Sequence, residues 1–231
     1  MGQTLRTGKL VLWGASTART MRPHWALHEL GLEYETQLIA PRSGELQTPE
    51  YRAINSREKV PTLQDGNVLI AESAAIVNYL ADRYGAGSGL TPPTGTIERG
   101  LYDQWCFFIM MELDAHTLYV IRKHGDLSDL YGQAPAAIEA AKEGFAKQVA
   151  AVNEELRARG PYLLGETFTG ADIHLTTCLE WADFVGIPLS ERLQEYVARL
   201  RERPAYQSAR SLNYSIHPDG TSAGVAGSDE L

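Results

Sequence analysis

Hydroxyl side chains gather in one short segment near the N-terminus, Ser16-Thr17-Ala18-Arg19-Thr20. The segment follows an apolar stretch, 9–15, that predicts a strand, and it precedes a helical pattern that runs to Gly31. A loop between a strand and a helix can bring a hydroxyl and free helix amides close to one developing negative charge. Ser16 and Thr17 are therefore candidate anion-stabilising residues, although such hydroxyls also serve as ordinary helix caps.

A second segment with chemical potential is Lys59-Val60-Pro61, which enters a predicted strand. Proline cannot donate to a strand ladder, so at a strand start it belongs at an edge or beside a ligand. A cis Val60-Pro61 bond would turn the Val60 amide and carbonyl outward, where an extended peptide could pair with them as an added strand. A Val-Pro pair before a hairpin also occurs without any ligand.

The third segment is Glu72-Ser73, directly after a predicted strand and at the start of a predicted helix. Helix amides and a hydroxyl point outward there, with the positive end of the helix dipole behind them, which is an arrangement that binds carboxylates. Taken alone, the pair is equally compatible with a plain helix cap.

The elements that position these segments follow the order β-α-β, then α, then β-β-α. The predicted elements are a strand at 9–15, a helix to Gly31, a strand at 34–40, a short helix at 49–54, hairpin strands at 60–64 and 68–70, and a helix at 72–84. The pattern predicts an α/β domain over 8–85, and the Gly- and Pro-rich stretch 86–96 predicts a linker.

Beyond the linker the strand pattern disappears and long helical patterns take over. They cover 97–123, 135–159, 171–185 and 190–203. We therefore expect an all-α helical bundle domain over 97–210 and a loosely ordered polar tail over 211–231.

Composition excludes several classes of function. There are 21 Lys and Arg against 29 Asp and Glu, and the net charge of −8 removes the basic field that nucleic acid requires. The apolar runs are too short for a transmembrane helix or a signal sequence, so the sequence predicts a cytoplasmic protein with no membrane association. Cys106 and Cys178 stand far apart among apolar neighbours, as buried thiols do.

In combination the segments resemble the cytosolic glutathione transferases. The runs that carry the resemblance are Trp25 to Glu35, Ala53 to Leu63, Glu72 to Leu80, and Thr169-Gly170-Ala171-Asp172-Ile173. The resemblance covers about 200 residues in order. It implies a thioredoxin-like glutathione-binding domain followed by the helical domain, a homodimer, and glutathione as co-substrate without a metal.

By this resemblance, each segment has a part in holding glutathione. Val60 pairs with the cysteinyl backbone and Pro61 is the cis proline. Glu72 and Ser73 hold the γ-glutamyl end. The glycyl carboxylate is met by Lys59, with Gln47 as a further contact. Thr169 and Asp172 are a structural capping box.

The expected chemistry is ionisation of the glutathione thiol. A free thiol has a pKa of ~8.5, and lowering it by ~2 units requires roughly 2.7 kcal/mol of preferential stabilisation of the anion. The resemblance to the theta-like class makes Ser16 the first choice for the hydroxyl that stabilises the thiolate anion. Thr17 is the second choice. Classes of the family that use a cysteine are disfavoured because the loop has none, and a thioredoxin-like dithiol reductase is disfavoured because the sequence has no Cys-x-x-Cys pair.

The electrophile is expected to be a small hydrophobic molecule. Trp105, Phe108 and Glu112 share one face of the 97–123 helix, which predicts a pocket lining or, more simply, bundle core. Addition, substitution, isomerisation, dehalogenation, ether cleavage and peroxide reduction all use the same thiolate. The alternative to an enzyme is a non-catalytic glutathione-binding or assembly module of the same fold.

Overall fold

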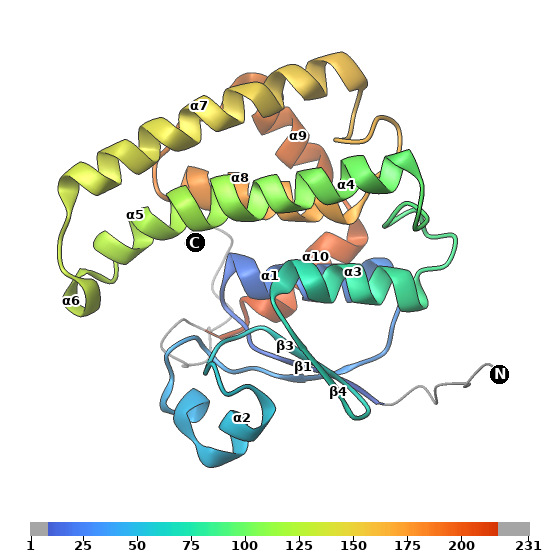
Figure 1. The fold of residues 1–231 in the computed structure, drawn as a ribbon, viewed down its shortest axis with the longest axis vertical. Helices are drawn as coiled ribbons and strands as arrows, with labels where there is room; N and C mark the ends of the chain where they lie inside the picture. Colours follow the sequence, from blue (N-terminus) through green and yellow to red (C-terminus); the bar gives the residue numbers. More distant parts are fainter. Residues whose placement is uncertain (1–8, 217–231) are drawn as a thin grey trace. The chain divides into compact units, whose positions relative to one another are not determined.

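The computed structural model describes residues 9–216, which form two compact units (Figure 1). One unit runs to Tyr84 and resumes at Arg203, and the other is Gly85–Glu202. None of the described helices combines the length and the apolar character needed to cross a bilayer.

The first unit is a mixed sheet with helices on both faces. Its elements are β1 (Leu10–Trp13), α1 (Ala18–Glu29), β2 (Glu35–Gln37), η1 (Gly44–Gln47), α2 (Pro49–Ile54), β3 (Thr62–Asp65), β4 (Val68–Ala71), α3 (Ser73–Tyr84) and α10 (Pro204–Asn213). The strand order is β2-β1-β3-β4, with β1 parallel to β2 and antiparallel to β3. This is the predicted thioredoxin-like fold.

Alternation along β1 divides its side chains between two layers. Leu10 and Leu12 are buried, whereas Trp13 points to the opposite face and meets Tyr51 of α2 edge to face, with ring centroids 5.9 Å apart. Figure 1 shows α1 and α3 on one side of the sheet and α2 on the other. The sheet is therefore covered on both sides, as its buried residues require.

The second unit is entirely helical. It contains α4 (Ile97–Phe108), the π-helical segment η2 (Ile109–Leu118), α5 (Tyr119–His124), α6 (Ser128–Tyr131), α7 (Pro135–Arg159), α8 (Gly170–Phe184) and α9 (Glu191–Arg201). The long helix α7 buries one stripe, made of Ala141, Phe145, Val149, Val152 and Leu156. Most of α8 is buried, so this helix forms the centre of the bundle.

A carboxylate at the start of α8 joins three parts of this unit. Asp172 is fully buried and accepts hydrogen bonds from the amides of Thr169 (2.8 Å) and Leu163 (2.9 Å) and from the Tyr196 hydroxyl (2.8 Å). The predicted return of Asp172 to the Thr169 amide is confirmed. The same residue also fixes a loop and α9, which gives it a larger part in folding than a cap alone.

Two predicted boundaries differ from the structure, and α10 explains both. The predicted helical domain, 97–210, extends beyond the division after Glu202, because residues from Arg203 pack on α1. The Arg203 guanidinium donates to both carboxylate oxygens of Glu29, at 2.6 and 2.7 Å. The predicted tail, 211–231, begins inside α10, and its residues 217–231 lie outside the described part of the chain.

Candidate functional site

The register of the sheet brings the three chemical segments to one end of it. Trp13 pairs with Thr62, and Thr62 pairs with Ala71 on its other side. The Ser16 loop leaves the sheet three residues after Trp13, Val60 enters two residues before Thr62, and Glu72 directly follows Ala71. Neighbours in this row lie about 5 Å apart, so segments far apart in the sequence converge.

Gly14 shows how closely two of these segments approach each other. It has a φ of 114°, and a Cβ placed on it would lie 2.5 Å from the Cβ of Val60. Only glycine satisfies both conditions. The backbone just before Ser16 is thus pressed against the Val60 side chain.

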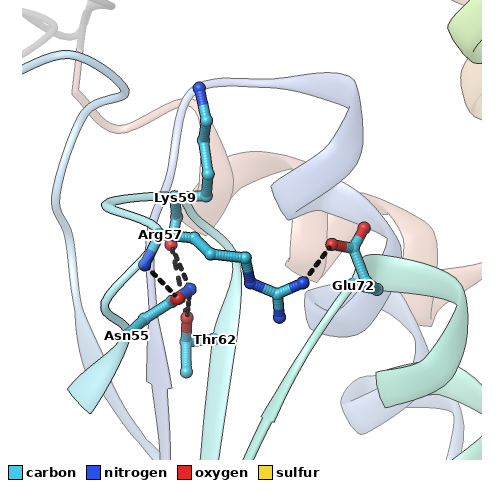
Figure 2. A network of polar contacts seen from close by, with 5 residues as sticks. All are labelled: Asn55, Arg57, Lys59, Thr62 and Glu72. Carbon is cyan, nitrogen blue, oxygen red and sulfur yellow. Dashed lines mark hydrogen bonds and ion pairs between the residues drawn. The ribbon is translucent and has the colours of Figure 1, made fainter.

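The loop that carries Val60 is held from behind by its Lys59 carbonyl. This oxygen accepts hydrogen bonds from the Tyr51 hydroxyl (2.6 Å), Asn55 Nδ2 (3.0 Å) and Thr62 Oγ1 (3.3 Å). Figure 2 shows Asn55 also bonded to Thr62 and, through its own oxygen, to the Arg57 amide. The sequence did not single out Tyr51 or Asn55 for the site. The only signal was that Asn55 lies inside the run Ala53 to Leu63 and that Tyr51 lies just before this run.

Val60 itself is left open by this network. The Val60–Pro61 bond is cis, as predicted, and the amide and carbonyl of Val60 make no hydrogen bond to any described residue. A backbone amide and carbonyl side by side can pair with an extended peptide.

The start of α3 offers donors to an anion. Within residues 9–216, no hydrogen bond takes up the amides of Ser73, Ala74 and Ala75, and Glu72 before them adopts a φ of 73°. The Ser73 hydroxyl is buried and accepts from the Arg22 guanidinium at 3.1 Å, which leaves its own proton to donate. These groups together suit a carboxylate.

An exposed ion pair adds charge beside this helix start. Arg57 Nη1 lies 3.3 Å from Glu72 Oε1, and both side chains are more than half exposed. Such a pair contributes little to stability, so both groups can turn toward a ligand. Arg57 is a third residue, after Tyr51 and Asn55, that the sequence did not single out for the site.

The two hydroxyls of the N-terminal loop differ in their engagement. Thr17 is the N-cap of α1, and its hydroxyl accepts from the Thr20 amide at 3.1 Å within a capping box. Ser16 is 7% exposed and has a φ of 61°, and its hydroxyl is buried without a hydrogen-bond partner among the described residues. The Thr17 hydroxyl is committed to folding, whereas the Ser16 hydroxyl is not.

The two residues expected to meet a glycyl carboxylate, Lys59 and Gln47, are both exposed. Gln47 ends the short helix η1. Figure 2 shows the Lys59 side chain extending in a different direction from that of Arg57, whose guanidinium reaches Glu72.

In the second unit, Trp105, Phe108 and Glu112 share a half-buried face that continues from α4 into η2. Trp105 and Phe108 contact edge to face, with ring centroids 5.7 Å apart. The i→i+5 bonding of a π-helix widens the turn where Glu112 lies, and π segments are frequent at functional sites. The face is aromatic at one end and acidic at the other.

Groups for other chemistries are scarce in the described part of the chain. Residues 9–216 contain no cluster of three or more His, Cys, Asp and Glu side chains that could hold a metal ion. Cys106 and Cys178 are buried and are not joined in a disulfide, and burial raises the pKa of the Cys106 thiol to about 12. A thiol held protonated in this way is a poor nucleophile.

Comparison with known families covers both units. The family model described as glutathione S-transferase, N-terminal domain, matches residues 8–82, and the one described as glutathione S-transferase, C-terminal domain, matches residues 135–203. Glutathione S-transferase GstA of Escherichia coli O157:H7 is 30% identical over 198 residues, which are 84% of this chain and 94% of that relative.

Solved structures show the same similarity. A glutathione transferase from Methylococcus capsulatus str. Bath aligns with a TM-score of 0.76 at 29% identity, over 90% of this chain and all of that one. The theta class glutathione S-transferase from Xanthomonas axonopodis pv. citri, with glutathione bound, aligns with a TM-score of 0.73 at 30% identity, over 87% and 97% of the two chains.

Proposed function

Since the chain belongs to the cytosolic glutathione S-transferase family, we propose that it binds reduced glutathione and ionises its thiol for attack on a small hydrophobic electrophile. Glutathione is the co-substrate, and the chemistry uses no metal. The family resemblance also leads us to propose a homodimer that acts in the cytoplasm.

The observation that carries this proposal is the convergence of open backbone groups at one end of the sheet. The Val60 amide and carbonyl suit the cysteinyl backbone of the tripeptide, and the α3 amides with Ser73 suit the γ-glutamyl carboxylate. Lys59, with Gln47, is proposed for the glycyl carboxylate, and Glu72 for the γ-glutamyl ammonium. A relative of the same fold has been solved with glutathione bound, which supports glutathione as the ligand.

Ser16 is proposed as the donor to the sulfur. Its unengaged hydroxyl follows β1 and lies next to the Thr17 cap of α1, where the helix dipole also favours an anion. The thiol proton leaves to solvent, and the thiolate then forms a carbon–sulfur bond with the electrophile. In substitution the leaving group departs with its bonding electron pair, and in addition the neighbouring carbanion takes a proton from water.

The deciding measurement is the ultraviolet absorbance of the bound thiolate, titrated with pH. The wild type is expected to hold the glutathione thiol with a pKa ~2 units below its free value, Ser16→Ala to lose most of that shift, and Thr17→Ala to keep it. Calorimetric binding with no lowering of the pKa would support the non-catalytic binding module instead. If Thr17→Ala lost the pKa shift as well, the Thr17 hydroxyl would also be needed to stabilise the glutathione thiolate.

The electrophile is proposed to contact the face formed by Trp105, Phe108 and Glu112. Phe108→Ala should raise the KM for an aromatic electrophile about tenfold, while the glutathione Kd stays unchanged. Phe107→Ala is the matched control, because Phe107 is 72% exposed and adjacent in sequence. Equal effects of the two substitutions would place the electrophile elsewhere.

A further inference from the structure

The last helix of the first unit ends on a buried asparagine that contacts the hydroxyl loop three times. Asn213 has no exposed surface. Its Oδ1 accepts from the Thr20 hydroxyl at 2.7 Å, its Nδ2 donates to the Thr17 carbonyl at 3.2 Å, and its backbone carbonyl accepts from the Ser16 amide at 2.7 Å. One residue, more than 190 positions away along the chain, thus engages three of the five loop residues.

The chemistry of these contacts suits asparagine in particular. The loop presents a hydroxyl donor and a carbonyl acceptor next to each other, and a side-chain amide supplies one acceptor and one donor in a fixed plane. The contact to the Ser16 amide fixes a residue whose φ of 61° is unfavourable for a side chain with a Cβ. Among the described residues, the Ser16 amide bonds only this backbone carbonyl, which any residue at 213 would supply, so what is particular to asparagine is its pair of side-chain bonds to Thr20 and Thr17.

The attachment of α10 to α1 does not depend on these contacts. The Arg203–Glu29 pair fastens the opposite end of α10, and Tyr206 packs edge-on against Trp25 with ring centroids 4.9 Å apart. Tyr206 is also buried. The helix is therefore held along its length, and the side-chain bonds of Asn213 serve the loop.

We propose that Asn213 is a positioning residue: it holds the Ser16–Thr20 loop so that the Ser16 hydroxyl meets the glutathione sulfur, and it thereby sets the acidity of the thiol. The inference rests on the proposed function of Ser16. A hydrogen bond weakens steeply with angle and distance, so a small displacement of the loop lowers the thiolate fraction without touching the residues that hold the tripeptide.

The first test compares Asn213→Ala with two controls on the same helix, Arg203→Ala and Ser208→Ala. Asn213→Ala should raise the pKa of bound glutathione by about 1 unit, which is roughly a tenfold loss of thiolate below both pKa values. Its Kd for S-methylglutathione, which has no thiol, should stay within about twofold of the wild type. Both controls should leave the thiol pKa unchanged, although Arg203→Ala lowers the melting temperature. An unshifted pKa in Asn213→Ala, or an equal shift in Arg203→Ala, overturns the proposal.

A second test needs no ligand and separates this inference from the proposed function. Amide hydrogen exchange in the free protein should be at least about tenfold faster over residues 14–20 in Asn213→Ala, and unchanged there in Arg203→Ala. Unaltered exchange in Asn213→Ala refutes the positioning role, whereas absence of glutathione uptake by the wild type refutes the proposed function. If Asn213→Ala does not fold, Asn213→Leu, which replaces the amide by an apolar side chain and removes both side-chain bonds to the loop, carries the same expectations.

Discussion

Replacing Ser16 by alanine should stabilise the free protein while impairing the chemistry. The Ser16 hydroxyl is buried without a partner among the described residues, and an unsatisfied buried hydroxyl costs about 1–3 kcal/mol in proteins. Alanine removes that cost and bears the same positive φ, so the backbone contribution cancels. We expect the free energy of unfolding to rise by about 1–2 kcal/mol and the melting temperature by roughly 3–6 °C for a protein of this size.

The assay is thermal unfolding followed by circular dichroism, on ligand-free protein at neutral pH. Thr17→Ala is the matched control, because it removes the hydroxyl that caps α1 and should lower stability by about 0.5–2 kcal/mol. The two adjacent substitutions are therefore expected to shift the melting temperature in opposite directions. A lower melting temperature for Ser16→Ala would mean that its hydroxyl is bonded in the folded protein, and the reasoning that reserves it for the sulfur would be refuted.

Three further outcomes are expected. Asn55→Ala removes the amide that donates to the Lys59 carbonyl, one of the three donors to that oxygen, and should weaken glutathione binding about tenfold by calorimetry. Unchanged binding would show that the Val60 loop keeps its shape without the Asn55 side chain. Burial lowers the pKa of His24 to about 4, so the folded protein resists protonation of this residue. The free energy of unfolding should therefore fall by about 3 kcal/mol as the pH drops from ~6.5 toward 4. His24→Gln should flatten that part of the urea-denaturation pH profile, and an identical profile would contradict the assignment. Asp172→Ala removes the carboxylate that four buried donors share and should cost at least about 3 kcal/mol or prevent folding, whereas soluble protein with an unchanged urea midpoint would be inconsistent with that network.

The sequence predicted the helices and strands of both units well where a single hydrophobic period ran through the segment. The short helix at 49–54 and the long one at 135–159 have the predicted limits. Both begin with Pro at the first helical position, and the long one is followed by Gly160, which are strong local signals. The π-helical segment inside 97–123 was not predicted. Its apolar residues fit a period of 3.6 as well as a wider one, so the change in hydrogen bonding leaves no pattern to detect.

The helix α10 could not be predicted from the same signals. The predicted helix 190–203 stops just before Pro204, whereas in the structure Pro204 is the first residue of a further helix. What fixes α10 in place is the pairing of Arg203 with Glu29 and of Tyr206 with Trp25. These contacts join residues more than 170 positions apart, and no periodicity encodes them.

The residues of the candidate site also divide into those that the sequence could predict and those that it could not. Segments that present backbone to a ligand, such as Val60-Pro61 and Glu72-Ser73, carry local signatures of proline and of a helix start. Residues that hold those segments from behind, such as Asn55, Tyr51 and Asn213, act through side-chain hydrogen bonds to backbone atoms and to neighbouring hydroxyls. Such bonds require a three-dimensional neighbour but no particular sequence spacing, so only the structure reveals them.

The end of the sheet where these segments meet is also where the first unit leaves polar groups unsatisfied. Counting partners within 9–216 only, Ser16 keeps a buried hydroxyl without a partner at a left-handed φ, Glu72 has a left-handed φ before three unbonded helix amides, and Val60 leaves its amide and carbonyl open. Folding alone would favour a glycine, a capping side chain and a paired strand at these positions. Because the departures lie on separate segments yet share one row of the sheet, a single ligand that bears a carboxylate, an extended backbone and an acidic thiol would satisfy all three.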